Sequence, residues 1–397
     1  MGPLQGVVIL DLTWLLSGPY GTMTLCDLGA EVIKLERPPH GDIGRTTGPQ
    51  INGESVFFFS LNRGKESITI DLGTDAGRDL FLSLVEQVDV VAQNYTPGVM
   101  ERLGLGWDVL SARNPRVIYA AVSGFGQTGP DRERPALDIV VQGESGLMSV
   151  TGVPGGAPLR PGVSLGDITA GLYMAIGVLA ALHERERSGL GQMIDISMLD
   201  CQIALLGNAL TRYFATGEIP RPLGSRHPSA TPFQAFPTKD GYIVLALTAG
   251  VENQWPLFCA SIGRVDLTDD PRFETNDLRT EHHAELEPLL NEALRRRTTA
   301  EWLGEFAPFE IPCGPVNNIQ QAAGLPQVAA REMLVDVPHP VIGTLRMPAT
   351  PVKLSRTPGG IQGPSPAIGQ DTDGVLQRLL NLDETVIAGL RKQRVVL

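Results

Sequence analysis

The chain has 397 residues, of which 42% are hydrophobic, and its 44 acidic residues against 32 Lys and Arg give a formal net charge of −12. This hydrophobic share is typical of a globular protein and excludes a disordered one, and the length exceeds that of one typical domain. An acidic chain without a basic block binds nucleic acid poorly, because neutralisation of phosphates dominates that affinity. We therefore expect no nucleic-acid partner.

The cysteines and the apolar runs indicate the compartment. Cys26, Cys201, Cys259 and Cys313 are far apart in the sequence, and none forms a C-x-x-C pair. This spacing disfavours a disulfide framework or a metal site and fits a reducing cytoplasm. The N-terminus lacks the basic start of a signal peptide, and the longest apolar helical run, 170–182, is shorter than the ~20 residues that span a bilayer. We expect a cytoplasmic protein that does not enter a membrane.

Strands and helices are expected to alternate through the first 218 residues, because short β-branched apolar runs are separated by amphipathic stretches. The predicted strands cover residues 7–10, 31–35, 68–72, 88–92, 117–122 and 193–197. The predicted helices cover residues 18–28, closed by Gly29, and then 76–86, 99–103, 167–187 and 199–215. This alternation favours an α/β fold with a parallel sheet.

The composition changes after residue 218. Residues 219–232 are rich in Pro, Gly and Ser, which predicts a loop or linker. A predicted strand, 242–247, and mostly helical sequence through 306 indicate a smaller second domain. Extended Pro-rich sequence over 338–366 precedes a closing helix at 372–380.

Asp167 is the first candidate for chemistry. It stands before an apolar helix in SLGDITAGLYMAIGVLAAL, where an acidic residue commonly caps free N–H groups. The helix dipole also favours an ionised carboxylate there, and an ionised carboxylate can act as a nucleophile. Glycines nearby (Gly162, Gly166, Gly171) let a bulky substrate approach the backbone. From the residues alone, a cap and a nucleophile both remain open.

Standard cofactor signatures are absent. The first strand is followed by LTWLLSGPYG rather than G-x-G-x-x-G, and the sequence contains no P-loop. Cations stand at the ends of predicted strands and helices: Arg37, Arg63, Lys65 and Arg102. Together they would supply the local positive field that an acidic protein needs to bind phosphates. Each of them alone is as readily an ordinary surface residue.

Eight segments, in the same order along the chain, closely resemble the class III CoA-transferase family (the CaiB/BaiF type). They are LQGVVILDLTWLLSGPYGTMTLCDLGAEVIKLERPPHGD, FFFSLNRGKESITIDL, NYTPGVMERLGLGWDVL, SGFGQTGPDRERPALDIVVQGESGLMSVTG, GVSLGDITAG, HERERSGLGQMIDISMLD, DDPRF and IPCGPVNNI. The resemblance implies an α/β fold with three parts. They are a large Rossmann-like domain over 1–218, a small α+β domain over 225–318, and an extended linker with a C-terminal segment over 319–397 that returns to the large domain. It also implies an interlaced homodimer.

The resemblance also implies roles for individual residues. Asp167 matches the family's nucleophile, and coenzyme A and acyl-CoA are implied as substrates, with no permanently bound cofactor and no metal. The residues implied at the CoA site are Leu15, Leu16, Ser17, Arg37, Asn94, Tyr95, Arg102 and Asp138, the last being an acidic position near the nucleophile. A CoA-contacting lysine of some members corresponds to Gly73 here, so phosphate binding would depend more on Arg37 and Arg102.

The implied reaction moves CoA between two carboxylic acids through intermediates on Asp167. A related α-methylacyl-CoA racemase needs an acid/base pair, and in such relatives a histidine precedes the aspartate of the corresponding segment. That position is Leu137 here, in PALDIVV, and leucine cannot transfer a proton, so the racemase is disfavoured. A carnitine-type transferase and a non-catalytic acyl-CoA-binding protein remain alternatives. So does a formyl-CoA/oxalate transferase, although GSRHPSATPFQAF lacks that branch's glycine-rich loop.

The substrates are less constrained by the sequence. We favour succinyl-CoA as the donor and a C4–C5 dicarboxylate or hydroxy-dicarboxylate as the acceptor. Arg226 and His227 are the candidate ligands for a second carboxylate. An ordinary surface turn is the alternative for that loop, since loops collect polar residues.

Overall fold

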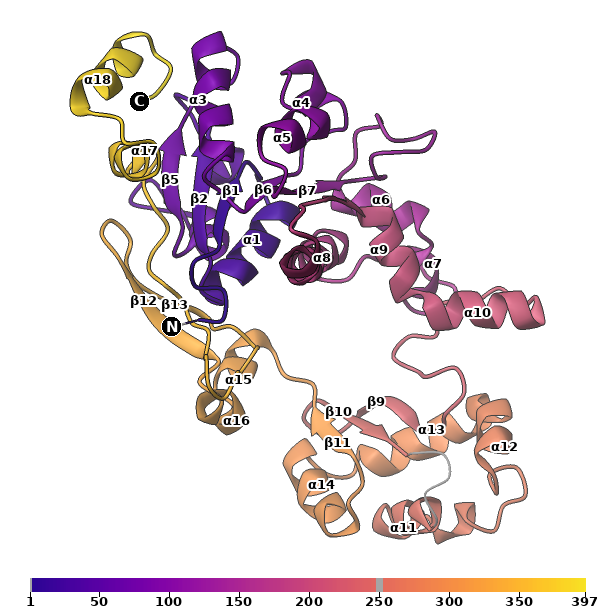
Figure 1. Ribbon diagram of the computed structural model, residues 1–397. Coiled ribbons are helices and arrows are strands. Elements are labelled where there is room, and N and C mark those ends of the chain that lie inside the picture. The colour runs from indigo at the N-terminus through magenta and orange to yellow at the C-terminus, as the bar shows by residue number, and fades with distance from the viewer. Residues whose placement is uncertain (1, 248–252) are drawn as a thin grey trace. The chain divides into compact units, whose positions relative to one another are not determined.

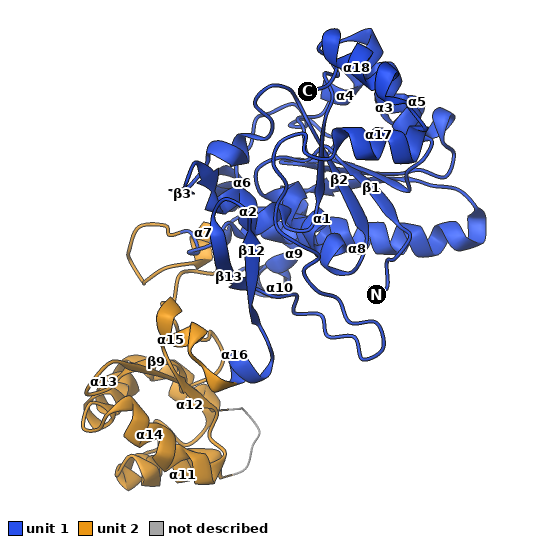
Figure 2. Cartoon of the chain, turned by 90° about the vertical axis from the view of Figure 1, so that its left-hand side faces the viewer, with its two compact units in different colours: residues 1–147, 160–218, 327–397 blue, residues 148–159, 219–326 orange. Residues whose placement is uncertain are grey.

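The computed structural model describes residues 2–247 and 253–397 and divides into two compact units (Figure 2). The first unit contains residues 1–147, 160–218 and 327–397, and the second contains 148–159 and 219–326. Residues 148–159, which were predicted to lie in the large domain, therefore belong to the second unit. The C-terminal segment belongs to the first unit, together with the N-terminal 147 residues.

A six-stranded parallel sheet forms the centre of the first unit (Figure 1). Its strands are β1 (Val8–Asp11), β2 (Glu31–Glu36), β5 (Glu66–Thr69), β6 (Val90–Gln93), β7 (Ile118–Ser123) and β8 (Met193–Ser197). They lie in the order β5-β2-β1-β6-β7-β8, so the direction of sheet growth reverses between β1 and β6. Ligands of such sheets bind at the carboxyl ends of the strands beside this reversal. The predicted α/β fold with a parallel sheet is confirmed.

Helices cover both faces of this sheet. Side chains alternate between the two faces along each strand, so the aligned residues Ile9, Val32 and Val90 pack on one side. That side is covered by α1 (Ser17–Asp27), α6 (Asp138–Glu144), α8 (Leu165–Ser188) and α9 (Met198–Leu205). The other side is covered by α3 (Asp75–Val85), α5 (Trp107–Arg113), α17 (Thr372–Leu380) and α18 (Glu384–Lys392). Burial on both faces explains why the strands read as continuous apolar runs.

The helices α1 and α8 approach each other backbone to backbone. A Cβ atom at Gly171 would lie 2.5 Å from the carbonyl oxygen of Ser17, and one at Gly21 would lie 2.6 Å from the carbonyl oxygen of Gly171. Only glycine fits such an approach. Ser17 and Asp167 each stand one turn before these glycines, and both line the same cavity. The crossing thus brings the first turns of two helices to one place.

The C-terminal segment attaches to the edge strand β5. The N–H of Ser67 donates to Asp371 Oδ2 (2.8 Å), and the N–H of Leu397 donates to Thr69 Oγ1 (2.9 Å). Just beyond the strand, the N–H of Asp71 donates to the carbonyl of Val395 (2.8 Å). The last residues therefore cover one edge of the sheet.

The structure differs from the predicted elements at several places in the first unit. The predicted helix 199–215 is two helices, α9 and α10 (Gly207–Thr216), which are separated at Leu206. The Pro-rich stretch contains part of a hairpin, β12 (Leu334–His339) and β13 (Gly343–Pro348). The predicted helix 99–103 is present as α4 (Val99–Arg102). Elements that were not predicted include η1 (Ile43–Thr46), β3 (Gln50–Ile51), β4 (Glu54–Ser55), α2 (Val56–Asn62), α7 (Leu147–Val150) and α16 (Pro326–Ala330).

Helix α8 extends well beyond its apolar run 170–182. Its 24 residues make it the one helix, among those described, that is long and apolar enough to cross a membrane. One side of it packs on α1 and on the sheet, through residues such as Ala170, Met174 and Val178. Such packing is that of a core helix.

The second unit is a small α+β assembly. Its antiparallel sheet has the order β11-β10-β9, from β9 (Phe233–Pro237), β10 (Tyr242–Ala246) and β11 (Cys313–Pro315). The helices are α11 (Gln254–Ser261), α12 (Asn276–Glu281), α13 (His283–Leu294), α14 (Thr299–Phe306) and α15 (Ile319–Ala323), with η2 (Val265–Leu267) and η3 (Ala307–Phe309). Phe236, Phe258 and Trp302 lie in its own hydrophobic core.

Replacing Gly171 by alanine should destabilise the protein, because the added Cβ would overlap the Ser17 carbonyl. Overpacking of this kind costs about 1–3 kcal/mol, so we expect a lower midpoint of thermal unfolding. Gly389→Ala is the matched control, since Gly389 lies in α18 and its Cβ position has no described neighbour within 4 Å. Equal stability of the two variants would contradict the close crossing.

Candidate active site

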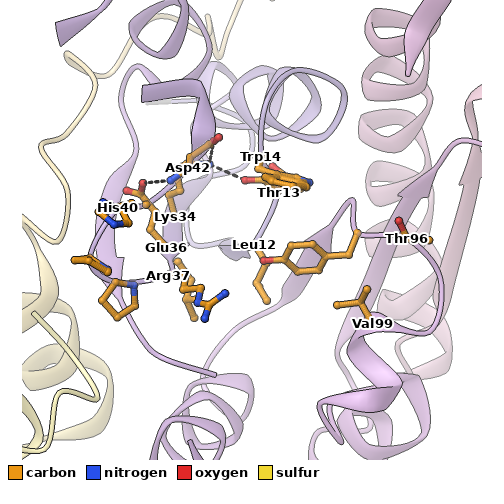
Figure 3. A pocket seen from close by; sticks show the side chains of 15 residues that line it. Leu12, Thr13, Trp14, Lys34, Glu36, Arg37, His40, Asp42, Thr96 and Val99 are labelled. Atoms are coloured by element: carbon orange, nitrogen blue, oxygen red, sulfur yellow. Dashed lines mark hydrogen bonds and ion pairs between the residues drawn. The ribbon is translucent and has the colours of Figure 1, made fainter. Parts of the chain in front are cut away.

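Three cavities lie at the carboxyl ends of β1, β2 and β6, within the first unit. The large cavity, about 710 Å³, is lined by the loop after β1, by the end of β2 and by the segment that follows it up to Asp42 (Figure 3). The arginine cavity, about 370 Å³, contains Arg37 and Arg102. The Asp167 cavity, about 170 Å³, contains Asp167. Tyr95 lines all three, so the cavities adjoin at this side chain.

The loop between β1 and α1 forms a wall of the Asp167 cavity. Leu15, Leu16 and Ser17 all line it, as predicted for the reactive end of the site. Leu15 has a left-handed φ of 61°, a conformation that is rare for a large side chain and costs of the order of 1–3 kcal/mol. Among the described residues other than glycine that have a positive φ, it is the one that lines this cavity.

Asn94 and Tyr95 follow β6, directly opposite this loop. Asn94 accepts a hydrogen bond from the N–H of Trp14 (2.9 Å) and donates to the carbonyl of Trp14 (2.9 Å) and to Ser17 Oγ (3.1 Å). It therefore fixes the loop in addition to lining the Asp167 cavity. Burial raises the pKa of Tyr95 to about 12, so its phenol is neutral and serves as a wall of the cavities.

Asp167 lies half-buried in the first turn of α8. The helix is capped at Ser164, so the interpretation of Asp167 as the N-cap is wrong. No described residue donates a hydrogen bond to its carboxylate. Burial, with a smaller contribution from the charge of Asp138, raises its pKa to about 7. The expectation that the helix start keeps this group fully ionised is also wrong, because a pKa near 7 leaves about half of the molecules protonated at neutral pH.

Asp138 stands behind the start of α8. Its Oδ1 accepts hydrogen bonds from the N–H groups of Gly166 (2.8 Å) and Asp167 (3.3 Å), and its Oδ2 accepts from Gln142 Nε2 (2.6 Å). It is not among the residues that line the three cavities. The placement beside Asp167 agrees with the predicted neighbourhood, and the contacts of Asp138 are with the start of α8.

Two of the four predicted phosphate-binding cations are suitably placed. Arg37 and Arg102 are both exposed at the arginine cavity, and within the described chain neither forms an ion pair. Gly73 lines the same cavity and adds no side chain to it. By contrast, Arg63 and Lys65 are buried and paired with carboxylates, at 2.6 Å from Asp27 and 2.9 Å from Asp11, respectively. Their prediction as phosphate ligands is therefore wrong.

Two further residues of the Asp167 cavity lie in the segment PDRERPALD. Leu137 is 65% exposed and cannot exchange a proton. Arg134, which the sequence reasoning missed, brings a cation into the same cavity. Its guanidinium donates to both oxygens of Glu144 (2.6 and 3.3 Å), pairs with Asp131 (3.1 Å) and lies 4.7 Å from the ring centroid of Phe125. The high density of charged residues in this segment was the sequence signal that could have identified Arg134 as a site residue.

Arg226 and His227 belong to the second unit. His227 Nδ1 accepts a hydrogen bond from the N–H of Ser229 (3.2 Å), and its ring lies 5.0 Å from that of Phe233. Arg226 Nε is buried and has no hydrogen-bond partner within the described residues.

The variant Asp167→Asn should unfold at a higher temperature than the parent at pH 8. The folded-state pKa is raised above the unfolded value, so the folded parent loses stability as the pH rises from about 4 to 7, whereas asparagine carries no charge to bury. Thermal unfolding at pH 4 and pH 8 measures this, and the difference between the proteins should vanish at the lower pH. A gain that is the same at both pH values would contradict the raised pKa.

Residues 4–372 match the family model described as CoA-transferase family III. The acetyl-CoA:oxalate CoA-transferase of Acetobacter aceti is 44% identical over 355 residues, which covers 89% of this chain and 90% of the relative. The human succinyl-CoA:glutarate CoA-transferase is 38% identical and covers 99% of this chain and 90% of the relative. The succinyl-CoA–D-citramalate CoA-transferase of Chloroflexus aurantiacus is 37% identical, with 99% and 98% covered.

The fold is shared with a solved member of the same group. The crystal structure of a CaiB/BaiF family protein from Brucella suis matches with a TM-score of 0.85 at 36% sequence identity, over 95% of this chain and 99% of that one. The family match extends across nearly the whole chain, and the curated relatives are named CoA-transferases. The chain belongs to CoA-transferase family III and is a transferase enzyme.

Proposed function

We propose that this enzyme transfers CoA from succinyl-CoA to a C4–C5 dicarboxylic or hydroxy-dicarboxylic acid, with Asp167 as the covalent nucleophile. The observation that carries the proposal is the carboxylate of Asp167, which is half-buried, receives no hydrogen bond from a described residue and lies in a cavity that adjoins a cationic one. The relatives named for glutarate and D-citramalate support the choice of acids.

Coenzyme A is proposed to extend across the three adjoining cavities. Arg37 and Arg102 would bind its phosphates by charge-assisted hydrogen bonds, since neither is engaged by a carboxylate in the described chain. The pantetheine arm would pass Tyr95, which all three cavities share, and the thioester would reach Asp167. The free arginines supply the local positive field that the net charge of −12 otherwise denies.

The reaction is proposed to run through two kinds of covalent intermediate. A carboxylate oxygen of Asp167 attacks the thioester carbonyl of succinyl-CoA, and the C–S bond breaks to give a mixed anhydride and CoA thiolate. The thiolate attacks the aspartyl carbonyl, which releases succinate and leaves an aspartyl-CoA thioester. The acceptor carboxylate then attacks this thioester, again releasing the thiolate, and the thiolate takes the acceptor acyl group and restores the carboxylate of Asp167.

A carboxylate suits this chemistry because an anhydride retains the activation of the thioester for the next step. Water has to be excluded, since it would hydrolyse either intermediate. The side chains of Leu15, Leu16 and Leu137 form apolar walls of the Asp167 cavity. The N–H of Gly166 is occupied by Asp138. The N–H groups of Ser17 and Gly18, in the first turn of α1, have no described acceptor, and we propose them as donors to the developing oxyanion.

The acceptor is proposed to carry a second carboxylate, which requires a second cation. Arg134 shares the cavity with Asp167 but is already engaged by Glu144. Arg226 and His227, which lie in the second unit, stay the ligands that the sequence predicts for this carboxylate. The second candidate reaction transfers CoA from acetyl-CoA to oxalate, because the relative of that name is 44% identical and the Asp167 cavity is small.

A homodimer is proposed as the functional form. The outer side of α8 exposes Leu172, Tyr173 and Ile176, and α10 exposes Phe214, of which 78% is accessible. Exposed apolar patches of this kind commonly mark protein–protein interfaces. A second copy of the chain would bury them.

Mass spectrometry tests the proposed nucleophile. The tryptic peptide that contains Asp167 spans residues 133–185, because trypsin does not cleave the bonds before Pro135 and Pro161. After incubation with succinyl-CoA, this peptide should carry an acyl or CoA adduct on Asp167 in the parent and none in Asp167→Asn. Adduct formation should become about tenfold faster from pH 5 to 6 and level off above about 7, because the ionised form attacks. Asp195→Asn is the matched control: desolvation also raises the pKa of Asp195, but this residue is exposed and accepts hydrogen bonds from the N–H of Gln127 away from the cavities. A parent without an adduct, or an Asp167→Asn variant with full transfer activity, would refute the mechanism.

A panel of acids tests the acceptor. Arg226→Gln should lower kcat/KM for glutarate or citramalate by roughly 10- to 150-fold, as expected for about 1.5–3 kcal/mol from a lost charge-assisted hydrogen bond. The loss should be small for butyrate, which has no second carboxylate. Arg134→Gln is the comparison, and a dicarboxylate-specific loss there instead would reassign the role. If oxalate is the fastest acceptor, the second candidate reaction replaces the first.

A further inference from the structure

The backbone from Thr13 to Leu15 is fastened at nearly every polar group. The N–H of Thr13 donates to Asp11 Oδ1 (2.9 Å), and its carbonyl accepts from Lys34 Nζ (2.7 Å). Asn94 holds the N–H and the carbonyl of Trp14. The N–H of Leu15 donates to Asp42 Oδ1 (3.2 Å). These bonds surround Leu15, which has a left-handed φ. Among the described apolar residues that line the Asp167 cavity, it is the one with this conformation.

Asp42 is itself firmly placed, from a different part of the chain. Its Oδ2 lies 2.9 Å from Lys34 Nζ, with both side chains at most 2% exposed. Its N–H donates to Glu36 Oε2 (3.0 Å), and Glu36 is held by Arg45 (2.6 Å). Figure 3 shows Lys34, Asp42 and Thr13 together at one wall of the large cavity. The sheet and the segment after β2 thus support the carboxylate that reaches Leu15.

A strained residue persists only where the surroundings hold it. Leu15 is bound through its N–H by a buried carboxylate whose charge Lys34 balances. The next residues, Leu16 and Ser17, begin α1 and line the Asp167 cavity. A change of φ at Leu15 would therefore move the wall that faces Asp167.

We propose that Asp42, backed by Lys34, is a positioning residue that holds Leu15 in its left-handed conformation and so fixes the loop wall opposite Asp167. Asp42 acts through the backbone of Leu15 and not on the reacting atoms. Its importance for turnover rests on the proposed function, whereas its effect on the loop does not.

The test compares the loss caused by Asp42→Ala in two backgrounds. In the parent, kcat should fall at least tenfold, with a smaller change in KM for the acyl-CoA. In a Leu15→Gly background the same substitution should cost less than threefold, because glycine adopts a positive φ without strain and needs no support. Leu16→Gly is the matched control background, since Leu16 has a negative φ of −124°, and there the full tenfold loss should remain. Equal losses in all three backgrounds would overturn the proposal.

Hydrogen exchange separates this proposal from the proposed reaction. Amide exchange in a peptide spanning residues 13–17 should accelerate in Asp42→Ala, and less so in Asp42→Asn, whose side-chain oxygen still accepts a hydrogen bond. Asp42→Asn also covers the case in which the alanine variant does not fold. If the parent has no transferase activity, the proposed function fails while the exchange measurement still decides the role of Asp42. Unchanged exchange in the folded variants would overturn that role.

Discussion

The contact between the backbones of α1 and α8 is the constraint on which the site depends. Gly21 and Gly171 allow the two helices to approach until one carbonyl oxygen occupies the place of a side chain. Both helices then begin at the same cavity, where the first turn of α1 presents N–H groups without a described acceptor and the first turn of α8 presents Asp167. A larger residue at either glycine would move Asp167 away from these donors.

The distribution of cations follows a second physical rule. Lys34, Arg63 and Lys65 are buried, and each is balanced by a carboxylate within 3 Å, because an unpaired charge in the interior is costly. These residues stabilise the sheet and its loops. Arg37 and Arg102 remain exposed and unpaired in the described structure. Two cations at the arginine cavity thus stay free of carboxylates in the described structure, although the protein as a whole is acidic.

The sequence predicted the sheet well, because strands buried on both faces are apolar without interruption. The strand at Met193–Ser197 and the helix at Thr372–Leu380 were predicted with their observed bounds. The break at Leu206 and the hairpin after residue 333 were missed, because neither interrupts the local hydrophobic pattern in a recognisable way. Residues 148–159 belong to the second unit through contacts with residues far along the chain, and local sequence patterns do not encode such contacts.

The candidate site was predicted in part, and the missing part is long-range. The site residues were predicted from motifs that resemble a family, and most of these residues line the Asp167 cavity. Local sequence could not show that Asp138 binds the start of a helix 28 residues further along. Nor could it show that Arg63 and Lys65 point inward or that burial raises the pKa of Asp167. The strain at Leu15 was invisible for the same reason, since Asp42 supports it from beyond the next strand.

The attachment of the C-terminal residues to β5 has a consequence for synthesis on the ribosome. The edge of the parallel sheet is covered by Asp371, Val395 and Leu397, which are translated after the whole of the second unit. The second unit can thus complete its core while the first still exposes an open strand edge, a surface on which other chains can pair. The first unit, whose strands are translated first, can therefore cover this edge of its sheet only after the second unit has been translated. Residues 371–397 thus supply the cover for the outermost strand of the sheet on which the site is built.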